Sequence, residues 1–279
     1  MNNNTKIFAD SFRDVFAFRD AINTRKDNGT CRDSSKTGSR DFAGMPYDEA
    51  VQRVTDGLPE VADSLKRELT KFAAAKTGNI NQRRPVNYYN GHSPNVPAAI
   101  IGLPKSMRKV VKTPSKVKTI RIFYQVSVNC DINSDDINKA GAAVLQLVYW
   151  LEIQGYRVEL VIVNYCASDG GKNRAVCTIC LKEFKQPLDI LKLSFSLGSV
   201  SMYRRLGFRW LETVPGLRGD WARGYGSQIG NKTEALKLLN AAGNNTDNSY
   251  FINYNDCKNA DFDAVKLGKQ QISSDLGGV

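Results

Sequence analysis

"TIRIFYQVSV" at residues 119–128 begins the stretch that decides the fold class. Two further segments complete it, "INKAGAAVLQLVYWLEIQGY" at 137–156 and "RVELVIVNYC" at 157–166. The first and third segments are short and rich in β-branched and aromatic residues, which is typical of buried strands. The middle segment has the apolar spacing of a helix, with Ser134 or Asp135 as N-cap and Gly155 as its stop. Together they predict two parallel strands joined by a right-handed crossover helix inside a larger sheet.

The segments that follow extend this sheet. "DGGKN" at 169–173 indicates a hairpin turn, so "RAVCTICLKEF" at 174–184 should return antiparallel. Residues 187–214 favour a helix, although "LKLSFSLG" within them also alternates like a strand. A glycine-rich loop at 215–232, a helix at 233–242, a strand at 249–254 and a helix at 260–272 complete a predicted α/β domain over 119–279.

Two further regions precede this domain. Residues 1–76 predict a helical region, with an amphipathic helix over 5–24, a loop over 25–46, and helices at 47–56 and 59–76. Residues 77–118 hold five of the nine prolines, which favours irregular structure. Because "VPAAIIGL" at 96–103 is too apolar for a free linker, we expect this segment to be an arm packed on the body.

Charge is unevenly distributed along the chain. Residues 70–125 contain eleven Lys or Arg and no Asp or Glu. Removing these eleven from the 39 basic residues leaves 28, which balance the 28 acidic residues. The whole net charge of +11 therefore comes from the arm and its borders, which indicates an anionic partner.

Composition also limits the cellular setting. The chain has no run of eighteen apolar residues, and its start, "MNNNTKIFADSFRDVF", lacks the parts of a signal peptide, so we expect no membrane association. The six cysteines are scattered, which is typical of free thiols in a reducing compartment such as the cytoplasm.

The order of the predicted elements from 119 to 272 resembles a von Willebrand factor A-like domain, a Rossmann-type fold with a mixed, mainly parallel sheet flanked by helices. Gln125, Ser127 and Asn129 fall where that family has the metal motif Asp-x-Ser-x-Ser. Because Gln125 replaces the main anionic ligand, a capped loop is favoured over a metal site. The weak metal candidates are Ser127, Asn129, Asp131, Asp135 and Asp136.

The chain as a whole is similar to an uncharacterised family of phage and prophage proteins. The resemblance lies in "GSRDFAGMPYDEAV" at 38–51, "NVPAAIIGLPKSM" at 95–107, "GAAVLQLVYWLEIQGYRVEL" at 141–160 and "QPLDILKLSFSLGSVSMYRRLGFRWLE" at 186–212. It implies a viral origin. We expect the host-cell cytoplasm as the location, with the virion as the alternative, and the sequence leaves open a homo-oligomer or a place in a larger phage complex. The resemblance implies no catalytic residue.

Other chemistry has little support in the sequence. Cys177 and Cys180 have zinc-knuckle spacing, but residues three apart on a strand point to opposite faces. The single histidine, His92, lies in a turn-rich segment without an evident catalytic partner. Gly224, Gly226 and Gly230 match no nucleotide-binding fingerprint, and Asn231 with Glu234 predicts an ordinary capping box. We therefore predict no catalytic residue and no cofactor, and favour a protein that is not an enzyme.

The basic arm is the main candidate for function. Cations that bind phosphates and aromatic rings that stack on bases are the components of sequence-tolerant binding to single-stranded nucleic acid. An acidic protein partner in an interaction or assembly role is the alternative, and a metal-dependent A-type domain is the third. The predicted nucleic-acid-binding residues are Arg83, Arg84, Tyr88, Tyr89, Lys105, Arg108, Lys109, Lys112, Lys116 and Lys118.

Overall fold

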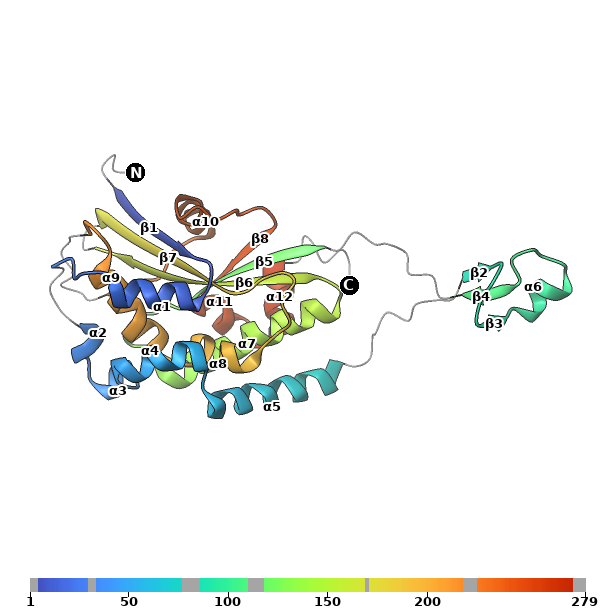
Figure 1. The fold of residues 1–279 in the computed structure, drawn as a ribbon, viewed down its shortest axis with the longest axis horizontal. Coiled ribbons are helices and arrows are strands. Elements are labelled where there is room, and N and C mark those ends of the chain that lie inside the picture. Colours follow the sequence, from blue (N-terminus) through green and yellow to red (C-terminus); the bar gives the residue numbers. More distant parts are fainter. Residues whose placement is uncertain are drawn as a thin grey trace.

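The computed structural model describes residues 5–29, 34–76, 86–109, 118–168, 171–217 and 225–272. Within them, a five-stranded sheet in the order β1-β7-β6-β5-β8 forms the centre of an α/β body (Figure 1). Only β7 against β6 is antiparallel, so the sheet is mainly parallel. The strands are β1 (Lys6–Phe12), β5 (Thr119–Gln125), β6 (Arg157–Ala167), β7 (Asn173–Lys182) and β8 (Ser249–Ile252).

The predicted strand–helix–strand unit is confirmed. β5 and β6 pair in parallel from Thr119 opposite Arg157 to Gln125 opposite Val163, and α7 (Ser134–Ile153) joins them. Asn133, and neither Ser134 nor Asp135, is the N-cap of α7, since its side chain accepts from the Asp136 N–H at 2.8 Å. The antiparallel return of β7 is confirmed as well.

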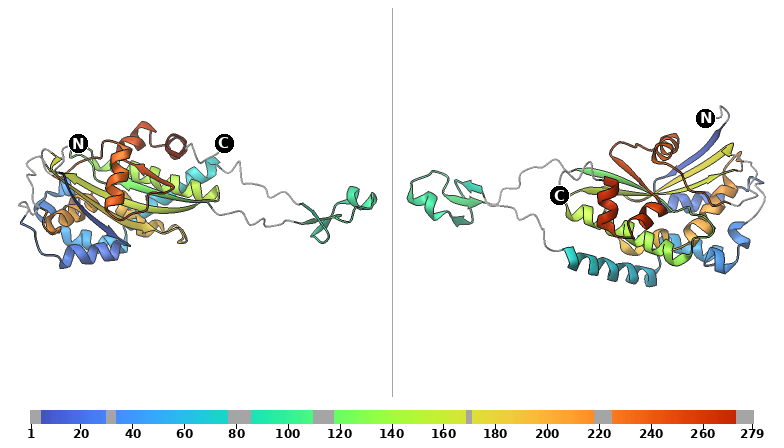
Figure 2. Two further views of the ribbon diagram at one scale, coloured as in Figure 1. Left: turned by 90° about the horizontal axis from the view of Figure 1, so that it is seen from above. Right: turned by 180° about the vertical axis from the view of Figure 1, so that it is seen from behind.

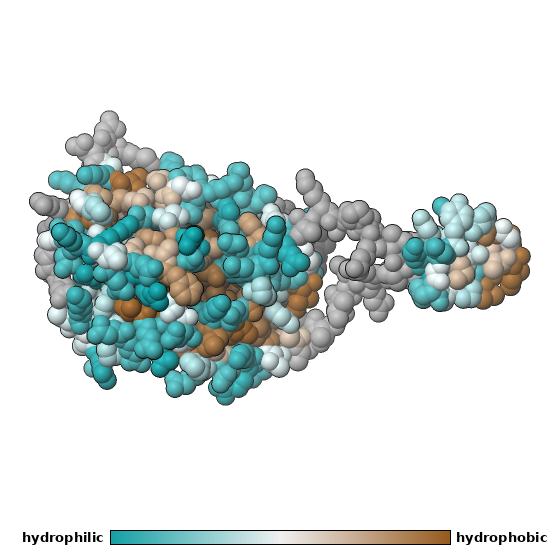
Figure 3. Space-filling view, viewed as in Figure 1, coloured by the Kyte–Doolittle hydropathy of each residue, from teal (hydrophilic) through white to brown (hydrophobic). Residues whose placement is uncertain are grey.

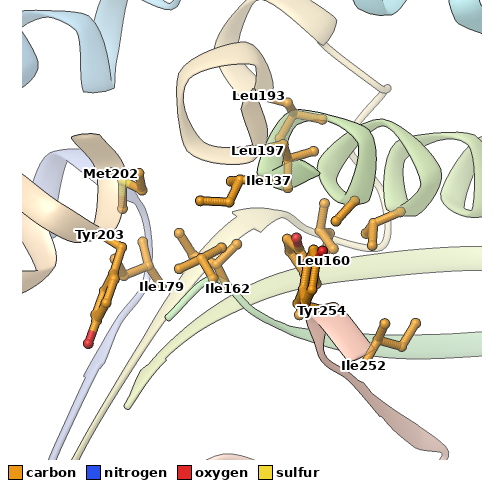
Figure 4. Close-up of a cluster of buried hydrophobic side chains, with 14 of the residues drawn as sticks. Ile137, Leu160, Ile162, Ile179, Leu193, Leu197, Met202, Tyr203, Ile252 and Tyr254 are labelled. Carbon is orange, nitrogen blue, oxygen red and sulfur yellow. The ribbon is translucent and has the colours of Figure 1, made fainter. Parts of the chain in front are cut away.

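The two faces of the sheet are covered unequally (Figures 1 and 2). One face packs against most of the helices, and Figure 4 shows part of that core between Ile162, Leu197 and Met202. The opposite face has a smaller core beneath α10 (Lys232–Ala241). The larger core is covered by α1 (Val15–Thr24), α4 (Tyr47–Asp56), α5 (Pro59–Lys76), α7, α8 (Ile190–Gly198), α9 (Phe208–Thr213), α11 (Tyr254–Asn259) and α12 (Ala264–Ile272).

Helices α7 and α8 approach each other closely because α7 has a glycine at the contact. A Cβ atom on Gly141 would lie 1.9 Å from the Leu197 carbonyl oxygen, so no larger residue fits without backbone movement. Gly57 is constrained twice, by a φ of +78° and by the Leu191 carbonyl 2.1 Å from its ideal Cβ position. These two glycines set how α7 and the turn before α5 pack on α8.

The prediction of one helix over residues 5–24 is wrong for its first half. Residues 6–12 form β1, which pairs in parallel with β7 from Lys6 to Phe12, and α1 begins only at Val15. The spacing of Phe8 and Phe12 is shared by one helical turn and by one face of a strand, so it did not distinguish the two. Asp14 fixes the boundary, because its carboxylate accepts from the Ala17 N–H at 2.7 Å.

Smaller corrections concern helical segments. The predicted loop over 25–46 contains the short helices α2 (Ser34–Thr37) and α3 (Arg40–Ala43). The helix favoured over 187–214 is confirmed but is interrupted after Gly198 and continues as the π-helix η3 (Met202–Gly207) and then α9. The helix predicted over 260–272 begins at Ala264 as α12, and α11 before it was missed. None of the described helices is long and apolar enough to cross a membrane.

The arm is not irregular throughout. Residues 86–109, here called the 86–109 unit, form a small antiparallel sheet in the order β2-β4-β3 with a short helix. Its elements are β2 (Val86–Tyr88), β3 (Ser93–Pro94), α6 (Val96–Ile100) and β4 (Met107–Lys109), drawn in green in Figure 1. Residues 77–85 and 110–117 lie outside the described residues, so the packing of the arm on the body stays a prediction.

Candidate nucleic-acid interface

The 86–109 unit is closed by backbone and side-chain hydrogen bonds. β4 pairs with β2 and with β3, and between the latter two the His92 N–H donates to the Arg108 carbonyl at 3.0 Å. Gly91 allows this approach, since a Cβ there would lie 2.1 Å from the same carbonyl oxygen. The Asn95 side chain donates to the Asn87 side chain at 2.9 Å. The unit is therefore a folded ribbon that can hold side chains in defined positions.

Two tyrosines and two lysines form one exposed cluster on this ribbon. Tyr88 and Tyr89 are 41% and 66% exposed, and their rings meet edge to face with centroids 5.8 Å apart. Lys109 Nζ lies 4.9 Å from the centre of the Tyr88 ring, and Lys105 Nζ lies 5.5 Å from that of Tyr89. Each cation–π contact contributes about 0.5–1 kcal/mol at an exposed site, so it orders the pair without preventing exchange for another ligand.

The cluster is cationic without local compensation. Arg108 and Lys105 are exposed, and Lys109 is half-buried with its ammonium donating to the Asn90 side chain at 3.1 Å. Because residues 86–109 contain no Asp or Glu, the positive charge is not neutralised within the unit. A polyanion would meet cations and aromatic faces within the same few residues.

The structure brings only part of the predicted set together. Tyr88, Tyr89, Lys105, Arg108 and Lys109 lie in the 86–109 unit. Lys118 belongs to the body, since its carbonyl accepts from the Arg157 N–H at 2.9 Å beside β5 and β6. Its Nζ lies 5.8 Å from the centre of the Tyr156 ring. The remaining predicted residues fall outside the described residues: Arg83, Arg84, Lys112 and Lys116.

Sequence reasoning missed a second surface of the same unit. Four aliphatic side chains, here called the apolar tip, are 48–78% exposed, and Figure 3 shows their brown surface at the outer end of the unit. The sequence predicts that "VPAAIIGL" packs on the body as part of the arm, which stays a prediction; within the unit, Ala98 is the one described side chain that is buried. The apolar tip consists of Val96, Ile100, Ile101 and Leu103.

The polar row at the carboxyl end of β5 forms an internal hydrogen-bond network. Gln125 is fully buried, and its Oε1 accepts from the Ile229 N–H at 3.1 Å, which fixes the orientation of the amide. The amide nitrogen then donates to the Ser227 carbonyl at 3.0 Å and to Ser127 Oγ at 2.7 Å. Ser127 Oγ also accepts from the Tyr165 N–H at 3.1 Å. Gln125 thus joins β5 to the glycine-rich loop.

This network does not fit a divalent metal. The amide nitrogen of Gln125 is a donor directed at Ser127 Oγ, whose two lone pairs are already used by N–H groups. Asn129, Asp131 and Asp135 are exposed, and Asp136 lies 3.1 Å from Lys139 Nζ. Among the described residues, no three His, Cys, Asp or Glu side chains gather where they could hold a metal ion. The donor set therefore suits a hydrogen-bonded loop.

Two buried arginines of η3 donate hydrogen bonds to backbone carbonyls of the body. Arg204 Nη1 donates to the Phe42 carbonyl at 2.9 Å, and its Nη2 donates to the Ile132 carbonyl at 2.8 Å in the loop after β5. Arg205 donates to the Met45 and Gly38 carbonyls, each at 2.8 Å. Burial lowers the pKa of both guanidiniums from its usual value. Because these cations bind the chain's own carbonyls, we assign them a structural role.

The cysteine pair and the glycine-rich loop, which the sequence analysis considered for zinc and nucleotide binding, lie within the packing and capping of the body. Cys177 and Cys180 point to opposite faces of β7, one into each core, as predicted. Burial raises the pKa of the Cys177 thiol well above its usual value. Asn231 caps α10 as predicted, but Glu234 forms no capping box in this structure, and its carboxylate pairs with Arg174.

Comparison with known proteins adds one match. The model of a family described as a domain of unknown function, DUF7192, matches residues 2–276. The chain belongs to this family. No curated protein sequence matches the chain, and no solved structure does. The match agrees with the predicted membership of an uncharacterised family and assigns no activity to any residue.

Proposed function

We propose that this DUF7192 protein binds single-stranded nucleic acid, with little dependence on base sequence, through the 86–109 unit. The observation that carries the proposal is the exposed pair Tyr88 and Tyr89 with Lys105 and Lys109 over their rings. Bases stack on tyrosine rings in any sequence, because every base has a π-face, and the cations bind the phosphates between them. We also propose that the protein is encoded by a phage or prophage and that its α/β body is a von Willebrand factor A-like domain.

The test measures binding of a fluorescent oligonucleotide of about 20 nucleotides, a length that covers one such site, at about 50 mM salt. Lys105→Glu with Arg108→Glu should weaken binding at least about tenfold, since two phosphate contacts become repulsive. The matched control is Lys258→Glu with Lys266→Glu, an equal charge change at exposed positions of the body. The control should bind within about twofold of the wild-type protein.

The tyrosines provide an independent readout. Tyr89→Ala should cost about 1–3 kcal/mol of binding free energy if a base stacks on that ring. The same change should leave the salt dependence of binding unaltered, because it removes no charge. Equal loss of binding in the two charge-reversal variants would assign the affinity to net charge alone and contradict the proposal.

Docking of an acidic protein is the second candidate function. The exposed apolar tip favours it, since aliphatic side chains in a cationic frame suit a protein surface as well. A protein partner that is retained after nuclease treatment and released by the Arg108→Glu change would support this alternative. The third reading, a metal-dependent A-type domain, is disfavoured by the hydrogen bonds of Gln125 and Ser127.

A further inference from the structure

The apolar tip is held by a turn that presents its side chains outward. At the end of α6, the Leu103 N–H donates to the Ala98 carbonyl at 2.9 Å and the Gly102 N–H donates to the Ala99 carbonyl at 3.1 Å. This is the hydrogen-bond pair of a Schellman motif, and Gly102 supplies the required left-handed residue with a φ of +73°. The backbone of the turn is thus satisfied internally.

The isoleucines of the tip do not stabilise this turn. Ile100 and Ile101 are 78% and 71% exposed, which are the two largest values among the exposed large apolar side chains of the described residues. Ala98 fills the inner side of the turn. Two adjacent β-branched side chains on a hydrogen-bonded turn, left almost wholly in contact with water, are suited to contact another molecule.

The charges around the tip indicate what that molecule is. Lys105 lies two residues after Leu103, and Arg108 and Lys109 lie on β4. No acidic residue occurs between 86 and 109, so the charged side chains of the unit that carries the apolar tip are all cationic. A duplex groove has the complementary arrangement, with phosphates on both sides and apolar base faces that become accessible when a step unstacks.

We infer that the apolar tip is a wedge for the minor groove of a nucleic-acid duplex. Ile100 and Ile101 enter a base step and kink the duplex, while Lys105 and Arg108 bind the flanking phosphates. This inference rests on the proposed function, and it adds duplex nucleic acid to the ligands of the same unit. One class of ligand then accounts for the tyrosine–lysine cluster and for the apolar tip.

A protein groove explains the tip less well. Specific protein interfaces bury roughly 800 Å² on each partner, whereas the tip offers four aliphatic side chains on one turn. A wedge needs only one or two apolar side chains between base pairs, with the affinity supplied by cations nearby. An anionic lipid surface is the remaining candidate ligand for the tip, and the experiment tests it with lipid vesicles.

The experiment uses the full chain and a duplex of about 30 base pairs with a donor and an acceptor dye at its ends, short enough to resist spontaneous bending. The wild-type protein should shorten the distance between the dyes on binding. Ile100→Ser with Ile101→Ser should abolish this shortening and weaken duplex binding about tenfold. The same variant should bind a single-stranded oligonucleotide within about twofold of wild type. Ile153→Ser, at an exposed position of α7, is the control and should bend the duplex normally.

Each other outcome overturns the inference in a distinct way. If the double variant bends the duplex like the wild type, or if the wild type binds single strands without bending duplexes, the wedge is wrong while the proposed function stands. If the wild type binds neither ligand, the proposed function itself fails. Loss of binding to phosphatidylserine vesicles in the double variant, without duplex bending by the wild type, would assign the tip to a lipid surface. A lower unfolding midpoint of that variant would show that the tip packs on the body.

Discussion

The α/β body and the 86–109 unit use their apolar side chains in opposite ways. In the body, β5, α7 and β6 bury nearly every large apolar residue, and Leu147, Leu151 and Leu160 are fully buried. In the unit, Ala98 is buried while Ile100 and Ile101 lie in solvent. Both regions are rich in aliphatic residues, so composition alone does not separate a core from an exposed surface.

The difference separates the source of stability from the surface that we propose for binding. Burial of apolar area stabilises the body by roughly 25 cal/mol for each Å² removed from water. The 86–109 unit gains little stability from apolar burial. Its fold is instead held by hydrogen bonds such as those at Gly102 and Asn95. Changes at its exposed residues should therefore have small effects on stability, and under the proposed function they should have large effects on binding.

The largest expected effect on stability lies in the core of the body. Leu147→Ala should lower the free energy of unfolding by about 2–5 kcal/mol, because it removes a fully buried side chain beneath the sheet and leaves a cavity. Chemical denaturation monitored by circular dichroism measures it. An unchanged midpoint would show that the strand–helix–strand core is not the one that stabilises the protein.

The contact between α7 and α8 should be nearly as sensitive. Gly141→Ala should cost about 1–3 kcal/mol, since the added methyl group would overlap the Leu197 carbonyl and outweigh the gain in helix propensity. Gly230→Ala is the matched control, because no atom lies within 4 Å of its ideal Cβ position. If both changes had the same effect on the unfolding midpoint, the close approach of the two helices would be wrong.

Alkaline pH should destabilise the body to a smaller extent. Burial raises the pKa of the Cys180 thiol from 9.0 to about 11 and that of the Tyr165 hydroxyl from 10.0 to about 12. Above about pH 9 the unfolded chain loses these protons before the folded chain does, so stability is full below that pH and falls as pH rises towards 12. Thermal unfolding at pH 7, 9 and 10.5 checks this, with a steady fall expected only above pH 9. A midpoint that rose between pH 9 and 10.5 would contradict the burial of these groups.

The smallest effect is expected in the 86–109 unit. Ile101→Ser should shift the free energy of unfolding by no more than about 0.5 kcal/mol, as for other exposed positions without special contacts. The measurement is the same denaturation used for Leu147→Ala, which serves as its reference. A shift comparable to that of Leu147→Ala would remove the distinction between the two regions.

The sequence was sufficient where each segment has one clear hydrophobic period of its own. Residues 119–184 combine a 2-residue and a 3.6-residue pattern with turn signals at Gly155 and Gly171, and their strands and helix are confirmed. The continuous apolar run in residues 157–166 does not show which side chains share a core: Leu160 and Ile162 lie in the larger core, whereas Val163 faces the opposite side of the sheet, under α10. The alternation of a strand covered on both faces explains this.

The sequence was insufficient where pairing across long distances decides the structure. β1 is a strand because it pairs with β7, 167 residues later in the chain, and no local pattern contains that partner. The fold of the 86–109 unit depends on paired segments of two or three residues and on Gly91, which are too short for a periodic signal. Charge clustering predicts the candidate interface without reference to the fold, and the binding role of that surface stays a prediction.

The most direct test of the central claim, that the 86–109 unit is the nucleic-acid interface, is ultraviolet crosslinking of a bound single-stranded oligonucleotide followed by mass spectrometry. Stacked aromatic residues lie closest to the bases, so the account predicts crosslinks at Tyr88 or Tyr89 and their loss at about 0.5 M salt, where phosphate contacts are screened. Crosslinks confined to residues of the α/β body would contradict it.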